Sequence, residues 1–128
     1  MVEAAIRETL KGQGDYREIY VLSTSFDNKP LATVAEFVMD PETFELVAMS
    51  EKQTEKLFHI AANPQVSLAY VKQRDDFRYF EGALGVQFVG TAQQLKGTDP
   101  GFEEAAQLYI PTWMNGLETQ RSFSAATM

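Results

Sequence analysis

The chain contains no cysteine and a single histidine, His59. The lack of cysteine excludes a disulfide framework, thiol catalysis and thiolate metal ligands. With one histidine, a metal site with two or more imidazole ligands cannot form. Nucleotide-binding motifs of the G-x-G-x-x-G and P-loop types are also missing. The sequence therefore contains no generic catalytic constellation, and we expect His59 to be a packing or surface residue rather than a general base.

Long apolar runs and clusters of basic residues are missing as well. No stretch approaches the ~20 apolar residues that span a bilayer, and residues 1–11 lack the apolar core of a signal peptide. The formal net charge is −7, and the eleven Lys and Arg residues are scattered. Because an acidic surface repels nucleic acids and anionic membranes, we expect a cytoplasmic protein that binds neither.

The composition that remains is that of an ordinary globular protein. Hydrophobic residues make up 45% of the 128 residues, and nine Phe and five Tyr are enough to build a core. This length is typical of one domain. The sequence contains no internal repeat, low-complexity segment or linker, so we expect residues 1–128 to form a single domain.

The hydrophobic patterns predict many short strands and a few helices. Runs rich in β-branched and aromatic residues indicate strands, and apolar residues at helical spacing indicate helices. The expected strands are residues 19–26, 31–39, 44–49, 65–71, 78–84, 86–95 and 120–126. The expected helices are residues 2–10, 53–62 and 102–110. Short turns join the first three strands into a meander, so we expect a mainly β fold, an antiparallel barrel of six to seven strands with short flanking helices.

Two local details are predicted from turn chemistry. Gly82, Gly85 and Gly90 fall within strands, where glycine indicates bulges or sharp bends that help a small barrel to close. Before the last helix, Asp99 is expected as the N-cap and Pro100 as the first helical residue.

One segment favours phosphate binding. A strand ends near Ser50 and a helix begins near Thr54. The N-terminus of a helix offers free N–H groups and the positive end of a dipole, which suit a phosphate. Ser50 and Thr54 add hydroxyl donors, and Lys52 and Lys56 add positive charge. The residues alone leave open a plain capping role for Thr54 and a solvated position for Lys56.

The order of motifs around this segment resembles a known family. Thr54-x-Lys56 is followed by Asn63-Pro64-Gln65-Val66-Ser67-Leu68 and later by a strand that ends in Gly90-Thr91-Ala92. This order is similar to that of the FMN-binding split-barrel proteins related to pyridoxamine 5'-phosphate oxidase, and in particular to their short, general-stress-protein-like members. The likeness covers residues 19–95. It implies a split β-barrel that forms a homodimer around FMN.

The resemblance also implies roles for individual residues. A serine or threonine and a lysine of the family contact the flavin phosphate, the strand before them lines the isoalloxazine, and the second strand adds further contacts. Late aromatic residues could cover the ring across the dimer interface, although simple core packing is the expected role of Tyr109. The implied cofactor-binding residues are Thr33, Val34, Met49, Ser50, Thr54, Lys56 and Trp113.

The sequence departs from the oxidases of this family in two places. They place an arginine near the position of Thr33, which is neutral here and implies weaker FMN binding or another phosphorylated cofactor. They also carry basic residues near the C-terminus for the phosphate of the substrate, whereas Arg121 is the only basic residue after Lys96. We therefore expect a protein that is not a true pyridoxamine 5'-phosphate oxidase, with an uncharged small molecule or a reduced nicotinamide as its substrate.

Three functions remain open at this point. The first is an FMN-dependent oxidoreductase, in which the flavin carries the chemistry. The second is a non-enzymatic module that stores or senses FMN or another cofactor. The third is a haem-handling relative, for which His59 is the only histidine ligand available.

Overall fold

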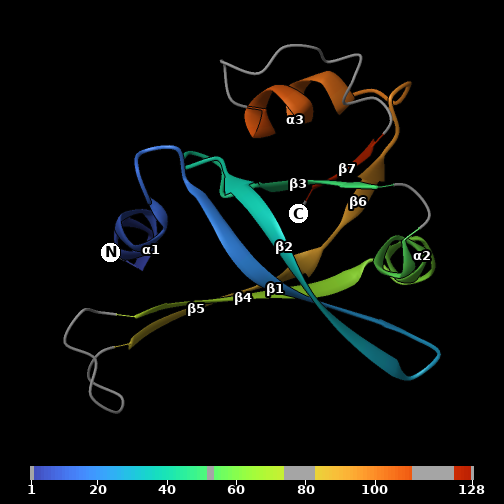
Figure 1. Cartoon of the computed structure of the whole chain (residues 1–128), viewed down its shortest axis with the longest axis horizontal. Coiled ribbons are helices and arrows are strands. Elements are labelled where there is room, and N and C mark those ends of the chain that lie inside the picture. The colour runs from blue at the N-terminus through green and yellow to red at the C-terminus, as the bar shows by residue number, and fades with distance from the viewer. Residues whose placement is uncertain (1, 52–53, 74–82, 111–122, 128) are drawn as a thin grey trace.

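Strands dominate the computed structural model, which describes residues 2–51, 54–73, 83–110 and 123–127. These residues form seven strands and three helices (Figure 1). In chain order the elements are α1 (Val2–Leu10), β1 (Arg17–Phe26), β2 (Lys29–Met39), β3 (Leu46–Glu51), α2 (Glu55–Ala62), β4 (Gln65–Gln73), β5 (Ala83–Thr91), β6 (Gln93–Leu95), α3 (Phe102–Tyr109) and β7 (Phe123–Thr127).

The seven strands form one antiparallel sheet in the order β5-β4-β1-β2-β3-β7-β6. Its two outermost strands, β5 and β6, are consecutive in the chain and are separated only by Ala92. The N–H of Ala92 donates to the carbonyl of Pro64 at 2.8 Å. The chain therefore bends at Ala92 and connects the two ends of the sheet, which closes the barrel. The predicted mainly β, six- to seven-stranded antiparallel split barrel is confirmed.

The barrel opens between β2 and β3. These strands pair only at Val38↔Val47 and Met39↔Leu46. Beyond that point β2 continues to pair with β1 on its other side, and β3 pairs with β7 as far as Glu51. The facing edges of β2 and β3 therefore separate, which leaves backbone donors and acceptors without ladder partners on that side. This opening is the split of the barrel.

The bend between β5 and β6 corrects the sequence prediction. Residues 86–95 were expected to form one strand, bent at glycines. Gly85 and Gly90 instead lie inside β5 without the positive φ that only glycine adopts easily, and the break falls at Ala92. Burial decides this position, because Ala92 is only 7% exposed and its small side chain fits into the core at the bend. Most of the predicted strand 78–84 and Gly82 lie outside the described residues.

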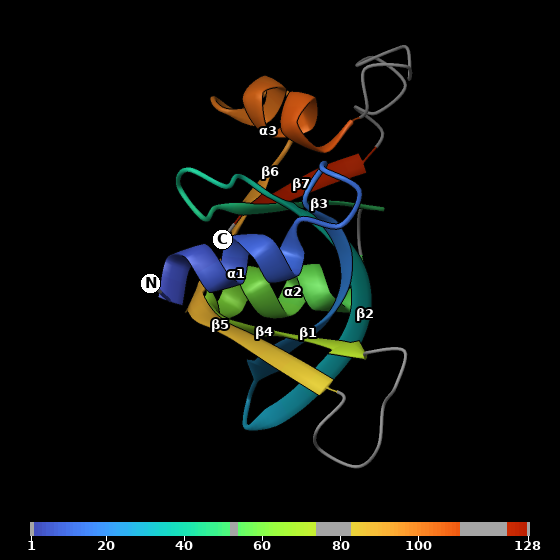
Figure 2. The same ribbon diagram turned by 90° about the vertical axis from the view of Figure 1, so that its left-hand side faces the viewer.

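The core fills the barrel from wall to wall. Tyr20, Phe37 and Leu68 are almost fully buried in it, and the rings of Tyr20 and Phe37 meet edge to face at 5.7 Å between centroids. Leu10 of α1 and Ile60 of α2 belong to the same cluster. In Figures 1 and 2 these two helices lie at opposite ends of the barrel, so each covers one open end. Within the described residues, no helix combines the length and the apolar composition needed to cross a bilayer.

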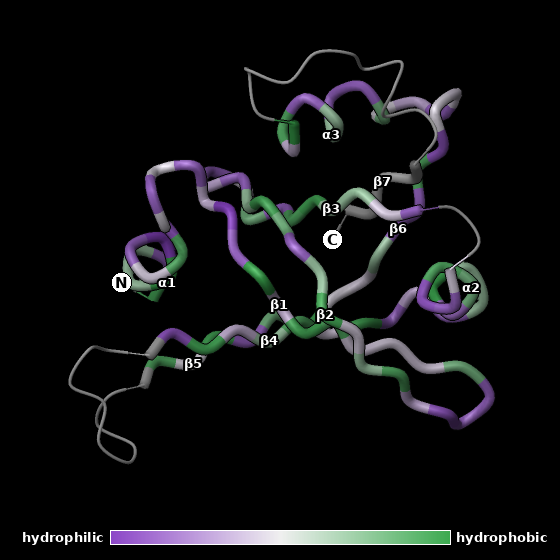
Figure 3. Tube along the Cα trace, in the orientation of Figure 1, coloured by the Kyte–Doolittle hydropathy of each residue, from purple (hydrophilic) through white to green (hydrophobic). Residues whose placement is uncertain are grey.

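Helix α3 packs outside the barrel on the far face of β3. Val47 and Leu95 join Phe102, Ala105 and Ala106 in a second apolar cluster. Strand β3 is therefore buried on both faces, since Leu46 and Ala48 point into the barrel while Val47 points toward α3. Figure 3 shows the resulting hydrophobic run through β3 and the hydrophilic tip of the β1–β2 hairpin.

The entry to α3 differs from the prediction. The N-cap is Gly101, with φ of 87°, and the helix begins at Phe102, so Pro100 precedes it. The carboxylate of Asp99 instead accepts the N–H of Lys96 at 2.7 Å and closes the turn before the helix. Because the Asp99 carboxylate is used inside the turn, it does not cap the helix. The N-cap position falls to Gly101, which tolerates the left-handed backbone found there.

Gly101→Ala is expected to destabilise the protein by about 1 kcal/mol, because the Cβ of an alanine is sterically strained in a left-handed backbone conformation. The cost is purely conformational, since the nearest atom to the added Cβ would be Leu95 Cδ1 at 3.8 Å. Gly90→Ala is the matched control, because Gly90 has no positive φ and no atom within 4 Å of the added Cβ. Urea denaturation should show a lower midpoint for the first variant only. Equal midpoints would contradict the assignment of strain to Gly101.

Candidate functional site

The predicted phosphate-binding residues meet where β3 leads into α2. Ser50 is buried at the end of β3, and its hydroxyl lies 3.5 Å from that of Thr54, the N-cap of α2. The Thr54 side chain makes no capping hydrogen bond. The hydroxyl that would normally satisfy a helix N–H instead pairs with Ser50, which places two hydroxyls side by side at the positive end of the helix.

The charge at this end of α2 is mixed. Lys56 is half-buried in the first turn of the helix. Glu55 stands next to it with a side chain that is 74% exposed, and Glu51 is exposed at the end of β3. Lys52, which was expected to add positive charge, lies outside the described residues. Among the described residues of this helix turn, Lys56 is the one cation that can pair with an anion.

The two predicted residues of β2 face opposite sides of the sheet. Thr33 faces inward, and its Oγ1 is buried without a hydrogen-bond partner. A buried hydroxyl without a partner costs about 1–3 kcal/mol, so it marks a place where an additional donor or acceptor would be stabilising. Val34 points outward and is 71% exposed. The structure therefore places Thr33 and Val34 on different surfaces.

The same alternation separates Met49 from Ser50. Met49 packs with the apolar cluster beneath α3, whereas Ser50 turns toward α2. A contact from Met49 to a ligand on the side of Thr54 would have to use its backbone. The remaining predicted residue, Trp113, lies outside the described residues.

Within the described part of the chain, polar contacts attach α2 to its surroundings at both ends and in the middle. Besides Ser50 and Thr54 at its start, His59 Nδ1 lies 3.1 Å from the hydroxyl of Thr24 on β1. At the C-cap, Asn63 Nδ2 donates to Ser25 Oγ at 3.0 Å. His59 is 7% exposed, which confirms the expectation of a packing residue. Sequence reasoning missed the role of the strand residues, because their partners are about 35 positions away in the chain.

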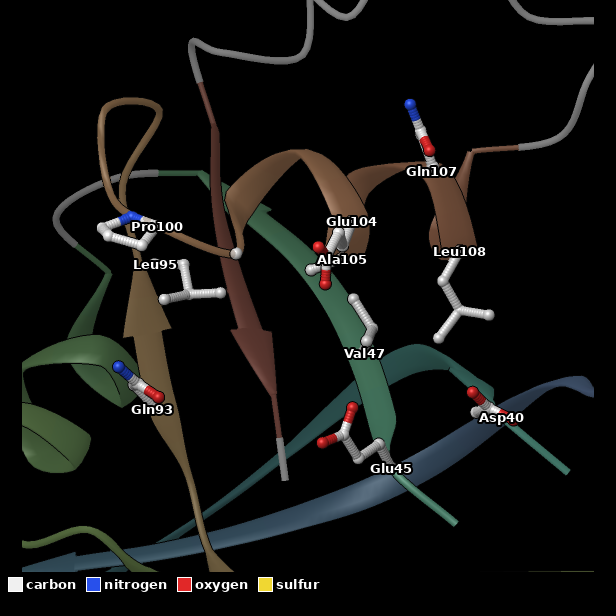
Figure 4. Close-up of a pocket in the computed structure, with 11 residues that line it drawn as sticks. Asp40, Glu45, Val47, Gln93, Leu95, Pro100, Glu104, Ala105, Gln107 and Leu108 are labelled. Carbon is white, nitrogen blue, oxygen red and sulfur yellow. The ribbon is translucent and has the colours of Figure 1, made fainter. Parts of the chain in front are cut away.

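A cavity lies elsewhere, between α3 and the sheet (Figure 4). Its volume is about 540 Å³, and Val47, Leu95 and Leu108 supply its apolar walls. The carboxylates of Asp40, Glu45 and Glu104 and the amide of Gln93 supply polar groups, whereas the amide of Gln107 points away from the cavity. Among the described residues that line it, none is basic and none belongs to the predicted site. Three carboxylates would repel a phosphate, so this cavity does not suit the phosphate of a flavin.

A second cavity of about 370 Å³ lies beside Arg17. The guanidinium of Arg17 donates to Glu36 at 2.9 Å and to the carbonyl of Tyr109, and it stacks on the Tyr109 ring at 4.8 Å. Burial and the Glu36 carboxylate raise the pKa of the Tyr109 phenol, whose hydroxyl donates to that carboxylate at 3.1 Å. Arg17 is therefore neutralised by its own partners and ties α3 to β1 and β2. Tyr109 has the packing role that was expected of it.

An apolar face is exposed on the outside of β2, β1, β4 and β5. Val21 lies opposite Val34 on one side and opposite Ala69 on the other, so the three share one face. By the same alternation Val71 and Val89 face outward with them, at 65% and 76% exposure. We call this surface the apolar sheet face; its members are Ile19, Val21, Val34, Ala69, Val71 and Val89. Exposed apolar surfaces of this kind are typical of interfaces.

Comparisons with known proteins agree with this architecture. The family model described as pyridoxamine 5'-phosphate oxidase matches residues 2–125. The chain belongs to the pyridoxamine 5'-phosphate oxidase family. Among curated protein sequences, the search found no match.

Solved structures of low sequence identity share the fold. A putative pyridoxamine 5'-phosphate oxidase from Listeria innocua is 18% identical with a TM-score of 0.64, over 99% of this chain and 91% of that one. The haem storage protein HutZ from Vibrio cholerae is 14% identical with a TM-score of 0.73, over 97% and 86%. General stress protein 26 from Bacillus anthracis is 17% identical with a TM-score of 0.68, over 99% and 87%. The family model therefore establishes the family. The structural neighbours are described with different functions, so they show the fold and no single activity.

Proposed function

We propose that the protein is a single-domain flavoprotein that binds FMN at the split of the barrel, between β2, β3 and the N-terminus of α2. The observation that carries the proposal is the pair of hydroxyls at the start of α2: that of Thr54 makes no capping hydrogen bond and lies 3.5 Å from that of Ser50. Lys56 would supply the charge-assisted contact to the phosphate. Backbone N–H groups of the first helical turn would supply further donors.

The flavin ring is proposed to lie along the open edges of β2 and β3. Both strands lack a ladder partner there, and such groups suit the polar rim of a flavin. Thr33 Oγ1, buried without a partner, would gain one from the cofactor. Thr33, Val34, Met49 and Ser50 are the proposed ring contacts, with Met49 acting through its backbone. Trp113 remains a proposed cover from the second subunit.

A haem site is less compatible with these residues. The chain has one histidine, and His59 is 7% exposed with its Nδ1 beside the Thr24 hydroxyl. Histidine ligation needs a free imidazole nitrogen that faces the haem iron. His59 would have to leave the core to provide one. The residues therefore support a flavin in preference to a histidine-ligated haem.

The proposed assembly is a homodimer through the apolar sheet face. This face exposes valine and isoleucine side chains on four adjacent strands, and a second copy of the chain would remove them from water. Because Val34 belongs both to this face and to the proposed ring contacts, the flavin would lie next to the interface. We expect each site to be completed by the partner.

The proposed activity is that of an oxidoreductase with an uncharged small molecule or a reduced nicotinamide as its substrate. Bound FMN would supply the hydride or electron transfer, and the chain would bind and orient it. Visible spectroscopy after titration with FMN tests the cofactor, and mass spectrometry identifies what co-purifies. Saturable binding with the paired flavin bands supports the proposal. A Soret band, or no flavin binding at all, would contradict it.

The protein is expected to form no pyridoxal 5'-phosphate from pyridoxine or pyridoxamine 5'-phosphate when loaded with FMN. A phosphorylated substrate needs a second set of cations beside an already anionic cofactor. In the described part of the site, Lys56 is the only cation, and it is assigned to FMN. A turnover assay with an established oxidase as positive control tests this. Robust product formation would point to Arg74, Arg78 or Arg121, which lie outside the described residues.

A further inference from the structure

The orientation of α2 on the barrel is fixed by buried polar groups. Apolar contacts from Leu57 and Ile60, each 3% exposed, hold the helix on the core. Such contacts are non-directional and tolerate small rotations and shifts of a helix. A hydrogen bond has a narrow distance and angle range, so it can select one position. Among the described residues, Thr24, Ser50 and His59 are polar and buried, and each belongs to α2 or contacts α2 or its N-cap Thr54.

The contact between His59 and Thr24 is the most enclosed of these. Thr24 is 3% exposed and His59 7% exposed, with 3.1 Å between Oγ1 and Nδ1. On the other side of the ring, Nε2 lies 3.9 Å from the carboxylate of Glu55. Thr24 Oγ1 and His59 Nδ1 are within hydrogen-bond distance, and the tautomer of the ring decides which of them donates. The ring of Phe26 completes the surroundings at 6.1 Å between centroids.

We propose that His59 and Thr24 are positioning residues for the phosphate site at the N-terminus of α2. The inference rests on the proposed FMN site. His59 lies about one helical turn after Thr54, Glu55 and Lys56, so a shift of its ring moves the first turn directly. The bond to Thr24 therefore sets where the Thr54 hydroxyl and the Lys56 ammonium stand relative to Ser50, which belongs to the barrel wall.

The experiment compares FMN with riboflavin, which has the same ring system and no phosphate. The ratio of their two dissociation constants in the parent protein reports the phosphate contact. Thr24→Val removes the hydroxyl at nearly constant volume, and His59→Leu removes the ring nitrogens. Both are expected to weaken FMN binding about twofold to tenfold and to leave riboflavin binding unchanged. Thr98→Val, at an exposed turn, is the matched control and should change neither.

Two further measurements separate positioning from a general loss of structure. His59→Asn can still accept a hydrogen bond near the place of Nδ1 and should recover most of the FMN affinity. Amide exchange in residues 55–58 of Thr24→Val should be faster than in the parent, while exchange in β4 stays the same. If His59→Leu does not fold, Thr24→Val decides the question.

The outcomes distinguish this inference from the proposed function. If the parent binds FMN and riboflavin equally, the assignment of the phosphate site is wrong, and the positioning role of His59 and Thr24 is wrong as well. If the parent prefers FMN and the folded Thr24→Val variant keeps the full preference, the proposed function stands and the positioning role is wrong. Equal losses for both ligands would also overturn the positioning role, because a purely structural effect does not distinguish the phosphate.

Discussion

Val89→Glu is expected to leave the protein folded and to shift it from dimer to monomer. Val89 is 76% exposed on β5, so in a single chain the new carboxylate would stay in water. In a dimer joined through the apolar sheet face, it would be buried without a partner, once in each half of a twofold-symmetric interface. Burial of an unpaired charge is strongly unfavourable. We expect the dissociation constant of the dimer to rise at least ~100-fold.

Light scattering at micromolar concentration measures this change. The parent should have about twice the 14.4 kDa chain mass, and Val89→Glu should have the mass of one chain with an unchanged circular dichroism spectrum and a cooperative melting transition. Val2→Glu is the matched control, because Val2 is 73% exposed on α1, away from the sheet face. A parent that is monomeric while flavin is bound would contradict the dimer. A Val89→Glu protein that stays dimeric would place the interface elsewhere.

Lys56→Ala is expected to weaken FMN binding about tenfold to a hundredfold. Lys56 belongs to the first turn of α2, where the helix dipole and the Thr54 hydroxyl also favour an anion. Its loss removes a charge-assisted hydrogen bond, which is worth about 1.5–3 kcal/mol. The nearby carboxylates of Glu51 and Glu55 would then face the phosphate without compensation.

Fluorescence titration with FMN and riboflavin measures the effect. Riboflavin lacks the phosphate, so its affinity should be the same for the parent and for Lys56→Ala. Lys11→Ala, at an exposed turn after α1, changes the net charge by the same amount and should bind FMN like the parent. Raising the salt concentration should reduce the difference between Lys56→Ala and the parent, because salt screens a half-exposed charge pair. If Lys56→Ala binds FMN as tightly as the parent, the assignment of the phosphate site is wrong.

The strands and helices were largely predictable, because each depends on local chemistry. Runs rich in β-branched and aromatic residues identify β1, β2 and β4, and helical spacing identifies α1 and α2 to within about two residues of the ends in the structure. Pro64 stops α2 where expected, since it disfavours helical geometry at Asn63. The strand near the C-terminus is present as β7. Strands, helices and helix ends of this kind depend on residues that are close in the sequence, so a local pattern can predict them.

The position of β7 in the sheet was not predictable from local patterns. β7 pairs with β3 on one side and with β6 on the other, although most of the chain separates β3 from β7. Likewise, the bend at Ala92 depends on where the two ends of the sheet meet, and no turn residue marks it. Long-range pairing of this kind is decided by how the whole sheet packs around its core.

Local sequence patterns predicted the β-rich class and the order of most elements, and the order of motifs indicated the family and pointed to Thr54 and Lys56 at a helix start. Tertiary structure decided which of the site residues share a surface. Thr33 faces inward and Val34 outward, and Met49 and Ser50 lie on opposite faces of β3. Adjacent residues of a strand face opposite sides, so the docking of the strand decides which side each one meets. Tertiary structure also buried His59 against Thr24, a contact between residues 35 positions apart. Such contacts depend on how a helix docks on a sheet, which no local pattern encodes.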